Sequence, residues 1–496
     1  MKDIKQKATK GVAWTAVGNW GSQLTTFVVF IILTRLLRPE DFGLVAMAAV
    51  FTSFVSVFAE QGLGQAIVQR DRLEPEHLDT AFWTNIILGT GLTVLGVLLS
   101  GLVAQIYAEP VLQPVVAVLS VSFLFTALSS TQQSLLQRTF DFRALSTRQL
   151  VAAIAGGIVG ITMAFMGFGV YALVGKALIT SLVGTIVLWR VSDWRPRFAY
   201  SREHFHELFG FGMSMVGVRI TNFFRTKLDD FLIGIFLGAQ ALGYYTVAYR
   251  LGRLVLDMFT GVMGNVAITT FARLQNDRDR LRVALHKITG VAGLITFPIF
   301  TGLVILAADL INTLSGAQWL PSVPAMRILS VAGFSLSLQY FLAYLIISLG
   351  KPNRLLVLNL IITLITAIAF IISARYGIVY VALAYAMVNV SFYAAYLGVA
   401  HRLLPLDLRR YLVDGWRFLI PSLLMGIVVY LLNFYLSTTS LNLYLRLALS
   451  VLSGVLLYTA IVFFFYHATF IELRQLLFGL LPGASSLKLV ETHELF

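Results

Sequence analysis

The sequence predicts an all-α polytopic membrane protein with about 14 transmembrane helices. Hydrophobic residues make up 58% of the 496 residues, against roughly 45–50% in soluble domains. Charged residues make up 12%, about half of the usual ~25%. The apolar residues fall in runs of about 20 or more, the length that crosses the hydrocarbon core of a bilayer. Soluble enzymes, disordered scaffolds and fibrous repeats are therefore excluded.

The expected spans follow one another with proline at several of the breaks. Pro39, Pro110, Pro321 and Pro405 lie there, where a missing amide hydrogen does no harm. The apolar runs cover residues 12–37, 42–68, 81–105, 110–137, 146–166, 169–189, 208–236, 240–271, 283–307, 322–349, 353–374, 377–400, 411–435 and 442–467.

The distribution of Lys and Arg predicts the orientation. The formal net charge is +13, but the basic residues form no single stripe, so we expect no nucleic-acid binding. Most of them lie at the N-terminus and in every second loop, whereas the opposite loops hold only Arg35, Arg38, Arg375 and Arg446. By the positive-inside rule both termini are cytoplasmic, which requires an even number of spans.

An internal repeat predicts how the spans are grouped. Residues 37–48 (LRPEDFGLVAMA) and 237–248 (LGAQALGYYTVA) share Leu, Gly and Ala at an offset of 200, and GVYALVGKAL at 169–178 resembles GIVYVALAYAM at 377–387. We expect six-helix bundles at 1–200 and 201–405, two extra helices at 406–470 and a cytoplasmic tail at 471–496. Two halves of six spans form a parallel repeat, which generally encloses a cavity. The alternative is chance similarity between apolar segments.

Charged side chains interrupt two adjacent spans. An ionisable residue in the membrane costs roughly 2.5–3.5 kcal/mol on the translocon scale and usually faces a cavity. The five basic residues outnumber the three acidic ones. They are Arg219, Arg225, Lys227, Asp229 and Asp230 in the seventh span and Arg250, Arg253 and Asp257 in the eighth.

We interpret Arg219, Arg250 and Arg253 as a cationic cavity wall that binds substrate. The guanidinium fork binds phosphate oxygens bidentately, so the expected substrate is an anion such as a pyrophosphate. Arg250 and Arg253 share one helix face with Asp257, at spacings i, i+3 and i+7. The alternative is that ion pairs lock the seventh and eighth spans together.

The remaining charges of the seventh span have candidate partners nearby. Arg225 and Asp229 are i, i+4 neighbours, and Lys227 and Asp230 are i, i+3 neighbours. We expect these four residues to form structural ion pairs.

Two carboxylates are candidates for ion coupling, Glu60 and Asp257, because an unpaired carboxylate in lipid tends to bind a proton. We expect no metal site and no cofactor. The chain has no cysteine, and His204 and His206 beside Glu207 do not make a helical metal motif. No Walker A loop is present, so ATP hydrolysis is not expected.

Two stretches resemble a known family. They read LxRLLxPxDFGxxA around Thr34–Ala46 and GLGxAxxQ at Gly62–Gln69. They resemble the Wzx-type polysaccharide flippases, closest to the branch with the colanic acid exporter, within the multidrug/oligosaccharidyl-lipid/polysaccharide exporter superfamily. The resemblance implies a bacterial inner-membrane protein, not an enzyme. It implies that an undecaprenyl-diphosphate-linked oligosaccharide moves from the cytoplasmic to the periplasmic leaflet by alternating access, coupled to an ion gradient.

The resemblance also implies binding partners, and it leaves alternative functions open. Cationic cavity residues are typical of the family, and we transfer that role to Arg219, Arg250 and Arg253. The partners would be the lipid-linked substrate, membrane lipids, and a polymerase with other polysaccharide-assembly proteins. The alternatives are that the protein is a lipid II flippase, a multidrug or cation antiporter, or a membrane polysaccharide polymerase or ligase. An antiporter of cations favours an acidic cavity, and a polymerase favours a large outward loop.

Overall fold

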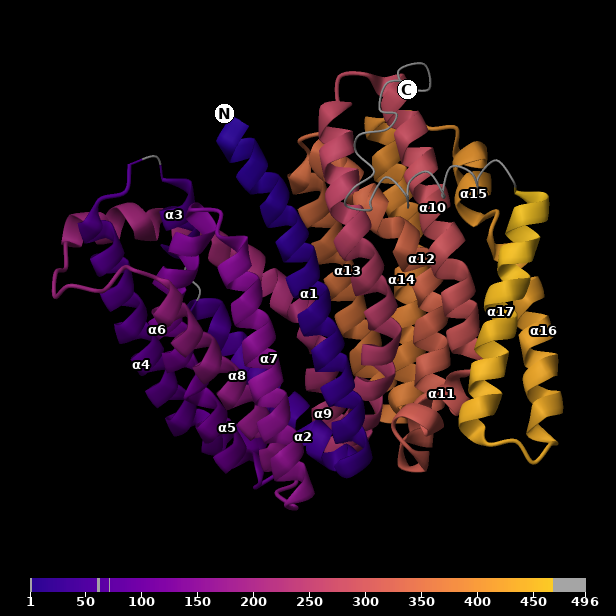
Figure 1. Cartoon of the computed structure of the whole chain (residues 1–496), viewed down its shortest axis with the longest axis horizontal. Coiled ribbons are helices and arrows are strands. Elements are labelled where there is room, and N and C mark those ends of the chain that lie inside the picture. Colours follow the sequence, from indigo (N-terminus) through magenta and orange to yellow (C-terminus); the bar gives the residue numbers. More distant parts are fainter. Residues whose placement is uncertain (1, 60–62, 71, 467–496) are drawn as a thin grey trace. The chain divides into compact units, whose positions relative to one another are not determined.

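The computed structural model describes residues 2–59, 63–70 and 72–466, and every regular element within them is helical (Figure 1). The predicted all-α fold class is therefore confirmed. The elements are α1 (Lys2–Leu36), α2 (Pro39–Ala59), α3 (Leu63–Gln69), α4 (Pro75–Tyr107), α5 (Leu112–Ser120), α6 (Ser122–Arg138), α7 (Phe142–Phe165), α8 (Val170–Val191), α9 (Arg202–Arg273), α10 (Arg278–Ile305), α11 (Ala307–Leu314), η1 (Ala317–Ser322), α12 (Val323–Ser348), α13 (Pro352–Ser373), η2 (Ala374–Tyr376), α14 (Ile378–Leu403), α15 (Leu408–Trp416), α16 (Leu419–Ser437) and α17 (Leu443–Phe465).

Twelve helical segments among the described residues are long and apolar enough to cross a membrane. α1 adds the shorter apolar segment Trp20–Leu36 at the place of the first predicted span. Arg219–Thr260 in α9 counts once among the twelve but covers the seventh and eighth predicted spans. These two features account for the fourteen spans that the sequence predicts.

α9 spans 72 residues and consists of two helices joined across a kink at Gly238, where φ is 79° and ψ is −179°. An L-residue with a side chain rarely adopts this backbone conformation, whereas glycine adopts it freely. The break lies between the two predicted spans, so the chain changes direction there without a separate loop.

Two other predicted spans each correspond to two helices in the described residues. The expected run 42–68 becomes α2, which ends at Ala59, and α3, which begins at Leu63. The expected run 110–137 becomes α5 and α6, which meet at Val121. Hydropathy alone does not reveal the break at Val121, because apolar residues lie on both sides of it.

The chain forms two compact units. Unit 1 contains Met1–Thr246 and Leu314–Gln318, and unit 2 contains Val247–Thr313 and Trp319–Phe496. In unit 1, α7 packs along α1 and α8 (Figure 1). A Cβ added to Gly156 would lie 2.7 Å from the backbone oxygen of Lys176, and one on Gly160 would lie 2.8 Å from the Lys176 Cβ. The G-x-x-x-G spacing thus lets α7 and α8 approach closely.

The core of unit 2 is built by α10, α12 and α14. Phe297, Phe300, Phe334 and Phe341 are buried in it, and the rings of Phe297 and Phe334 lie 5.1 Å apart at 73°. α16 and α17 form a hairpin that packs on α10 (Figure 1). This core fixes the side chains that α9, α12 and α14 present to one another.

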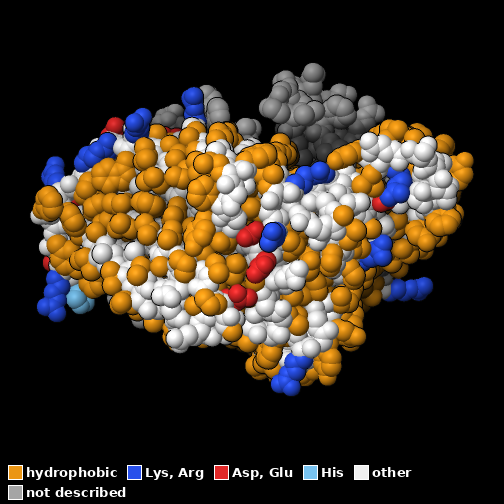
Figure 2. Space-filling view, turned by 90° about the horizontal axis from the view of Figure 1, so that it is seen from below, with side chains coloured by type: hydrophobic (Ala, Val, Ile, Leu, Met, Phe, Trp, Pro, Cys, Tyr) orange, Lys and Arg blue, Asp and Glu red, His pale blue; other side chains and the backbone are white. Residues whose placement is uncertain are grey.

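Large apolar side chains cover much of the exterior. Leu364, Ile372, Leu456 and Phe464 are each more than 60% exposed. Figure 2 shows a face on which hydrophobic side chains predominate and charged side chains are scattered. Such a surface is stable in a lipid environment and unfavourable in water.

Several contacts bring the connections of unit 1 close together. The Arg138 guanidinium donates to the backbone oxygen of Ile67 at 2.8 Å and also to that of Arg70. The backbone N–H of Arg197 donates to Asp79 at 2.9 Å. These contacts join the end of α6 to α3 and the residue after it, and the connection before α9 to the second turn of α4.

Candidate functional site

The charged residues of α9 belong to both units, and each group has its own surroundings. Asp229 is buried, with 7% of its surface exposed, and accepts hydrogen bonds from the Tyr245 hydroxyl at 3.1 Å and the Asp230 N–H at 2.9 Å. The Lys227 ammonium lies 2.7 Å from the Asp230 carboxylate. The exposed Arg225 donates to the Asn222 side chain at 3.4 Å. The structure thus has a Lys227–Asp230 ion pair, whereas Arg225 and Asp229 have other partners.

In unit 2, Arg253 is the centre of a polar cluster. Its Nε donates to the Asp257 carboxylate at 3.1 Å, and its Nη1 donates to the Tyr249 hydroxyl at 3.0 Å. The Tyr249 ring lies 6.2 Å from the Tyr385 ring of α14, and Tyr340 of α12 is also within electrostatic reach of the guanidinium. The cluster therefore combines one cation with several phenol groups from three helices.

The other two predicted binding residues are half-buried. Arg219 lies in unit 1, and Arg250 lies in unit 2 one turn before Arg253. Both have interactions within the structure. The bonds from Arg253 to Tyr249 and Asp257 use only part of the donor capacity of its guanidinium fork. The arrangement can bind an anion by hydrogen bonds and present phenol rings and hydroxyls to a polar headgroup.

The tyrosines were not among the predicted binding residues. Tyr249 lies within the charged stretch of the eighth span, four residues before Arg253, so its position could have indicated a role. Tyr340 and Tyr385 come from distant helices, and no local pattern marks them.

Of the two predicted coupling residues, the structure describes only Asp257. Glu60 lies outside the described residues. Asp257 is about half exposed and forms the ion pair with Arg253.

One group of side chains could hold a metal ion. Ligand atoms of Glu74, His77 and His204 lie within 4.8 Å of one another at the beginnings of α4 and α9. Spacing along the chain could not reveal this group, because His204 lies more than a hundred residues after the other two.

The hydrogen bonds of this group give it a structural role. The Glu74 N–H donates to Nδ1 of His77 at 3.2 Å, as part of a capping box that begins α4. Nε2 of His77 is then the protonated nitrogen and donates to Glu207 at 3.1 Å. Arg70 pairs with the same carboxylate at 2.6 Å. The bonds from His77 and Arg70 lower the pKa of Glu207. These contacts tie the beginnings of α4 and α9 together.

Comparisons with known proteins agree with this architecture. Residues 32–324 match the family described as "Polysaccharide biosynthesis protein". The "Succinoglycan biosynthesis transport protein ExoT" of Rhizobium meliloti is 26% identical over 460 residues, which are 92% of each chain. The "Lipopolysaccharide biosynthesis protein WzxC" of Escherichia coli is 24% identical over 418 residues, which are 83% of this chain and 85% of that protein.

Among solved structures, the lipid II flippase MurJ in an inward closed conformation has a similar fold. Its TM-score is 0.76 at 16% sequence identity, over 92% of this chain and 99% of that chain. The resemblance that the sequence motifs indicated is confirmed by the family match and the relatives, and the fold by the structural likeness.

Proposed function

The chain belongs to the polysaccharide biosynthesis protein family, and on this premise we propose that it is a flippase for an undecaprenyl-diphosphate-linked oligosaccharide. The substrate would move from the cytoplasmic to the periplasmic leaflet of the bacterial inner membrane. Both chain termini would lie in the cytoplasm. A polysaccharide polymerase and other assembly proteins would use the product.

The polar cluster around Arg253 carries this proposal. Arg253 lies in Arg219–Thr260, a segment long and apolar enough to cross a membrane, yet it is surrounded by Tyr249, Asp257 and Tyr385. A diphosphate with sugars cannot enter hydrocarbon without prohibitive desolvation. A guanidinium can replace water around the phosphates, and phenol rings and hydroxyls can contact sugars.

The proposed cycle is alternating access. The site around Arg250 and Arg253 would bind the headgroup from one side of the membrane, and a conformational change would then open it to the other side. The lipid tail would remain in the bilayer throughout. The protein's part is binding and reorientation of the headgroup, with no bond made or broken.

The charge of the site favours this function over that of a multidrug or cation antiporter. A site for cationic drugs would require a surplus of carboxylates, whereas α9 carries more Arg and Lys than Asp. Lipid II has the same diphosphate chemistry, so transport assays with both lipids would separate these two substrates.

The test compares Arg253→Ala with the double variant Arg253→Ala/Asp257→Ala. A lost charge-assisted hydrogen bond is worth about 1.5–3 kcal/mol, or roughly tenfold to hundredfold in affinity. We expect both variants to insert into the membrane and to lose export by at least about tenfold. Arg225→Ala removes a guanidinium from the same helix and is the control. If the double variant recovers both export and thermal stability, Arg253 serves only to neutralise Asp257 and the binding role is wrong.

Ion coupling is the second part of the proposal. Glu60 and Asp257 would take up a proton or cation in the transport cycle. Glu60→Gln should then reduce export that is driven by an imposed proton gradient, while the amount of inserted protein stays the same. Unchanged export by both Glu60→Gln and Asp257→Asn would exclude the two residues from coupling.

A further inference from the structure

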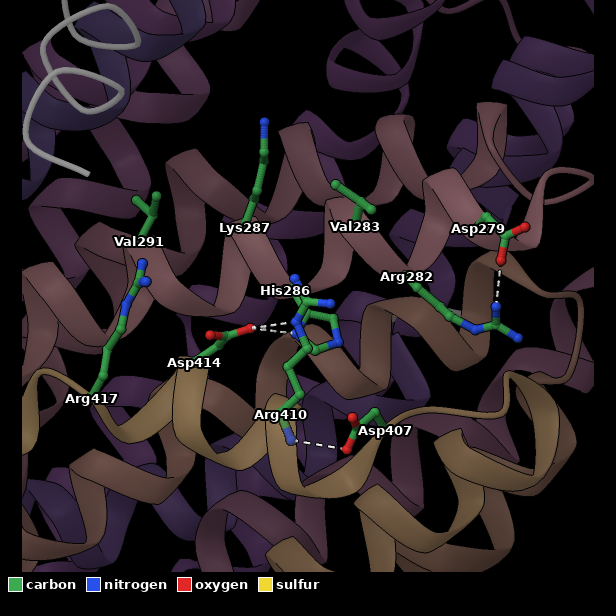
Figure 3. Close-up of a pocket in the computed structure, with 10 residues that line it drawn as sticks. All are labelled: Asp279, Arg282, Val283, His286, Lys287, Val291, Asp407, Arg410, Asp414 and Arg417. Carbon is green, nitrogen blue, oxygen red and sulfur yellow. Dashed lines mark hydrogen bonds and ion pairs between the residues drawn. The ribbon is translucent and has the colours of Figure 1, made fainter. Parts of the chain in front are cut away.

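Unit 2 contains a cavity of about 520 Å³ between the first turns of α10 and the short helix α15. Figure 3 shows the side chains that line it. Its volume is in the range of sites for small molecules. It is lined by Asp279, Arg282, Val283, His286, Lys287, Val291, Asp407, Arg410, Asp414 and Arg417. None of these residues belongs to the cluster around Arg253.

The three carboxylates of the cavity already have partners. Asp279 pairs with Arg282 at 2.5 Å, and Asp414 accepts from Nδ1 of His286 at 2.7 Å. Asp407 caps α15, where it accepts from the Arg410 N–H at 3.1 Å. Its charge is therefore offset by the partial positive charge at the helix N-terminus.

Two arginines of the cavity are less fully matched. Arg410 is 76% exposed and reaches Asp414 only at 4.0 Å. Arg417 has a buried Nε without a hydrogen-bond partner. Its guanidinium carbon lies 4.7 Å from the centre of the Phe418 ring, and one terminal nitrogen would be 3.2 Å from a Cβ on Gly290. Arg417 lines the cavity, so the other donors of its guanidinium can bind an anion there.

The position of the cavity indicates the kind of anion. α10 and α15 both belong to segments long and apolar enough to cross a membrane. The arginines at the beginning of α10 are typical of a helix end at the membrane surface. Val283, which is 56% exposed, and Val291 place apolar groups beside the cations. A ligand with a phosphate next to an apolar part matches this lining.

We propose that this cavity binds the phosphate headgroup of an anionic membrane lipid. Basic pockets between transmembrane helices bind such headgroups through guanidinium and ammonium groups. Arg417 and Arg410 would contact the phosphate, Lys287 would add positive charge, and the two valines would contact the glycerol and the first carbons of the acyl chains. The lipid would join α10 to α15. This site is independent of the proposed transport function.

Lipid retention tests the proposal on the full-length protein. The protein is reconstituted in nanodiscs of equal phosphatidylglycerol and phosphatidylcholine, extracted into mild detergent, and analysed by native mass spectrometry for bound lipid. We expect the unmodified protein to retain phosphatidylglycerol and the variant Lys287→Gln/Arg417→Gln to retain about tenfold less. The control Arg280→Gln/Arg409→Gln removes the same charge from α10 and α15 outside the cavity, and it should retain lipid normally.

Two further arms identify the source of the phosphate and guard against misfolding. Inorganic phosphate at millimolar concentration should not displace the lipid; if it does so completely, the site binds free phosphate and the lipid assignment is wrong. Arg410→Glu changes an exposed side chain and should also weaken lipid retention. It therefore tests the site even if variants of Arg417 fail to fold. Equal retention by the cavity and control variants, or no preference for phosphatidylglycerol, would overturn the proposal.

Discussion

Gly43 and Gly243 each face the backbone of the segment that contains the other. A Cβ on Gly43 would overlap the backbone oxygen of Ala239, and a Cβ on Gly243 would overlap that of Pro39. The two glycines are equivalent positions of the predicted internal repeat, and their contacts are reciprocal. Two related segments that pack about a local two-fold axis have this geometry. The reciprocity favours a true repeat over chance similarity.

The first prediction concerns this close approach. Gly43→Ala and Gly243→Ala should each destabilise the protein, because the backbones must separate to admit a methyl group; overpacking of this kind costs about 1–3 kcal/mol. Thermal unfolding in detergent measures the effect. Gly91→Ala in α4 is the control, since a Cβ there would meet nothing within 4 Å. Equal melting temperatures for all three variants would contradict the close contact.

The second prediction concerns orientation. Reporter fusions at Gln318 and at Asp277 should indicate opposite sides of the membrane, with Asp277 in the cytoplasm, because basic residues flank it. A phosphatase that is active only outside the cytoplasm gives the readout. Activity at both positions, or at neither, would contradict the parity of the spans.

The third prediction concerns an ion pair in unit 2. Arg446 of α17 pairs with Asp309 of α11, whose carboxylate also accepts from Asn433 of α16 at 2.7 Å. Arg446→Leu leaves a mostly buried carboxylate without its cation, which costs about 3–5 kcal/mol in comparable pairs. The double variant Arg446→Leu/Asp309→Asn should recover much of the melting temperature. A double variant as unstable as the single one would show that the pair is not coupled.

The fourth prediction concerns the join between α4 and α9. The pKa of Glu207 is lowered by its bonds to His77 and Arg70, so its contribution to stability is present above the ordinary value of 4.5. It is lost as the pH falls through the lowered pKa. Glu207→Gln should therefore melt below the unmodified protein at pH 6, and the difference should shrink below about pH 4. Glu203→Gln, an exposed change one turn earlier, should show no such trend.

The sequence by itself determined the fold class, the approximate spans and the family. These properties follow from the frequency of apolar residues, from the lengths of the apolar runs and from local motifs. All three can be recognised in the amino-acid sequence alone. The similarity between the segments that contain Gly43 and Gly243 can also be recognised in the sequence alone. The break between α5 and α6 cannot be recognised there, because apolar residues lie on both sides of it.

The tertiary structure decided which side chains meet. Arg253 was a predicted binding residue, but Tyr385 and Tyr340 join it only because α12 and α14 pack beside α9. Arg225 and Asp229 have the right spacing for an ion pair, yet burial and the Tyr245 hydroxyl give Asp229 another partner. The cavity beside Arg417 needed α10 and α15 to come together across more than a hundred residues of chain. Hydropathy acts locally and can be read from composition, whereas hydrogen bonds depend on distances that only packing sets.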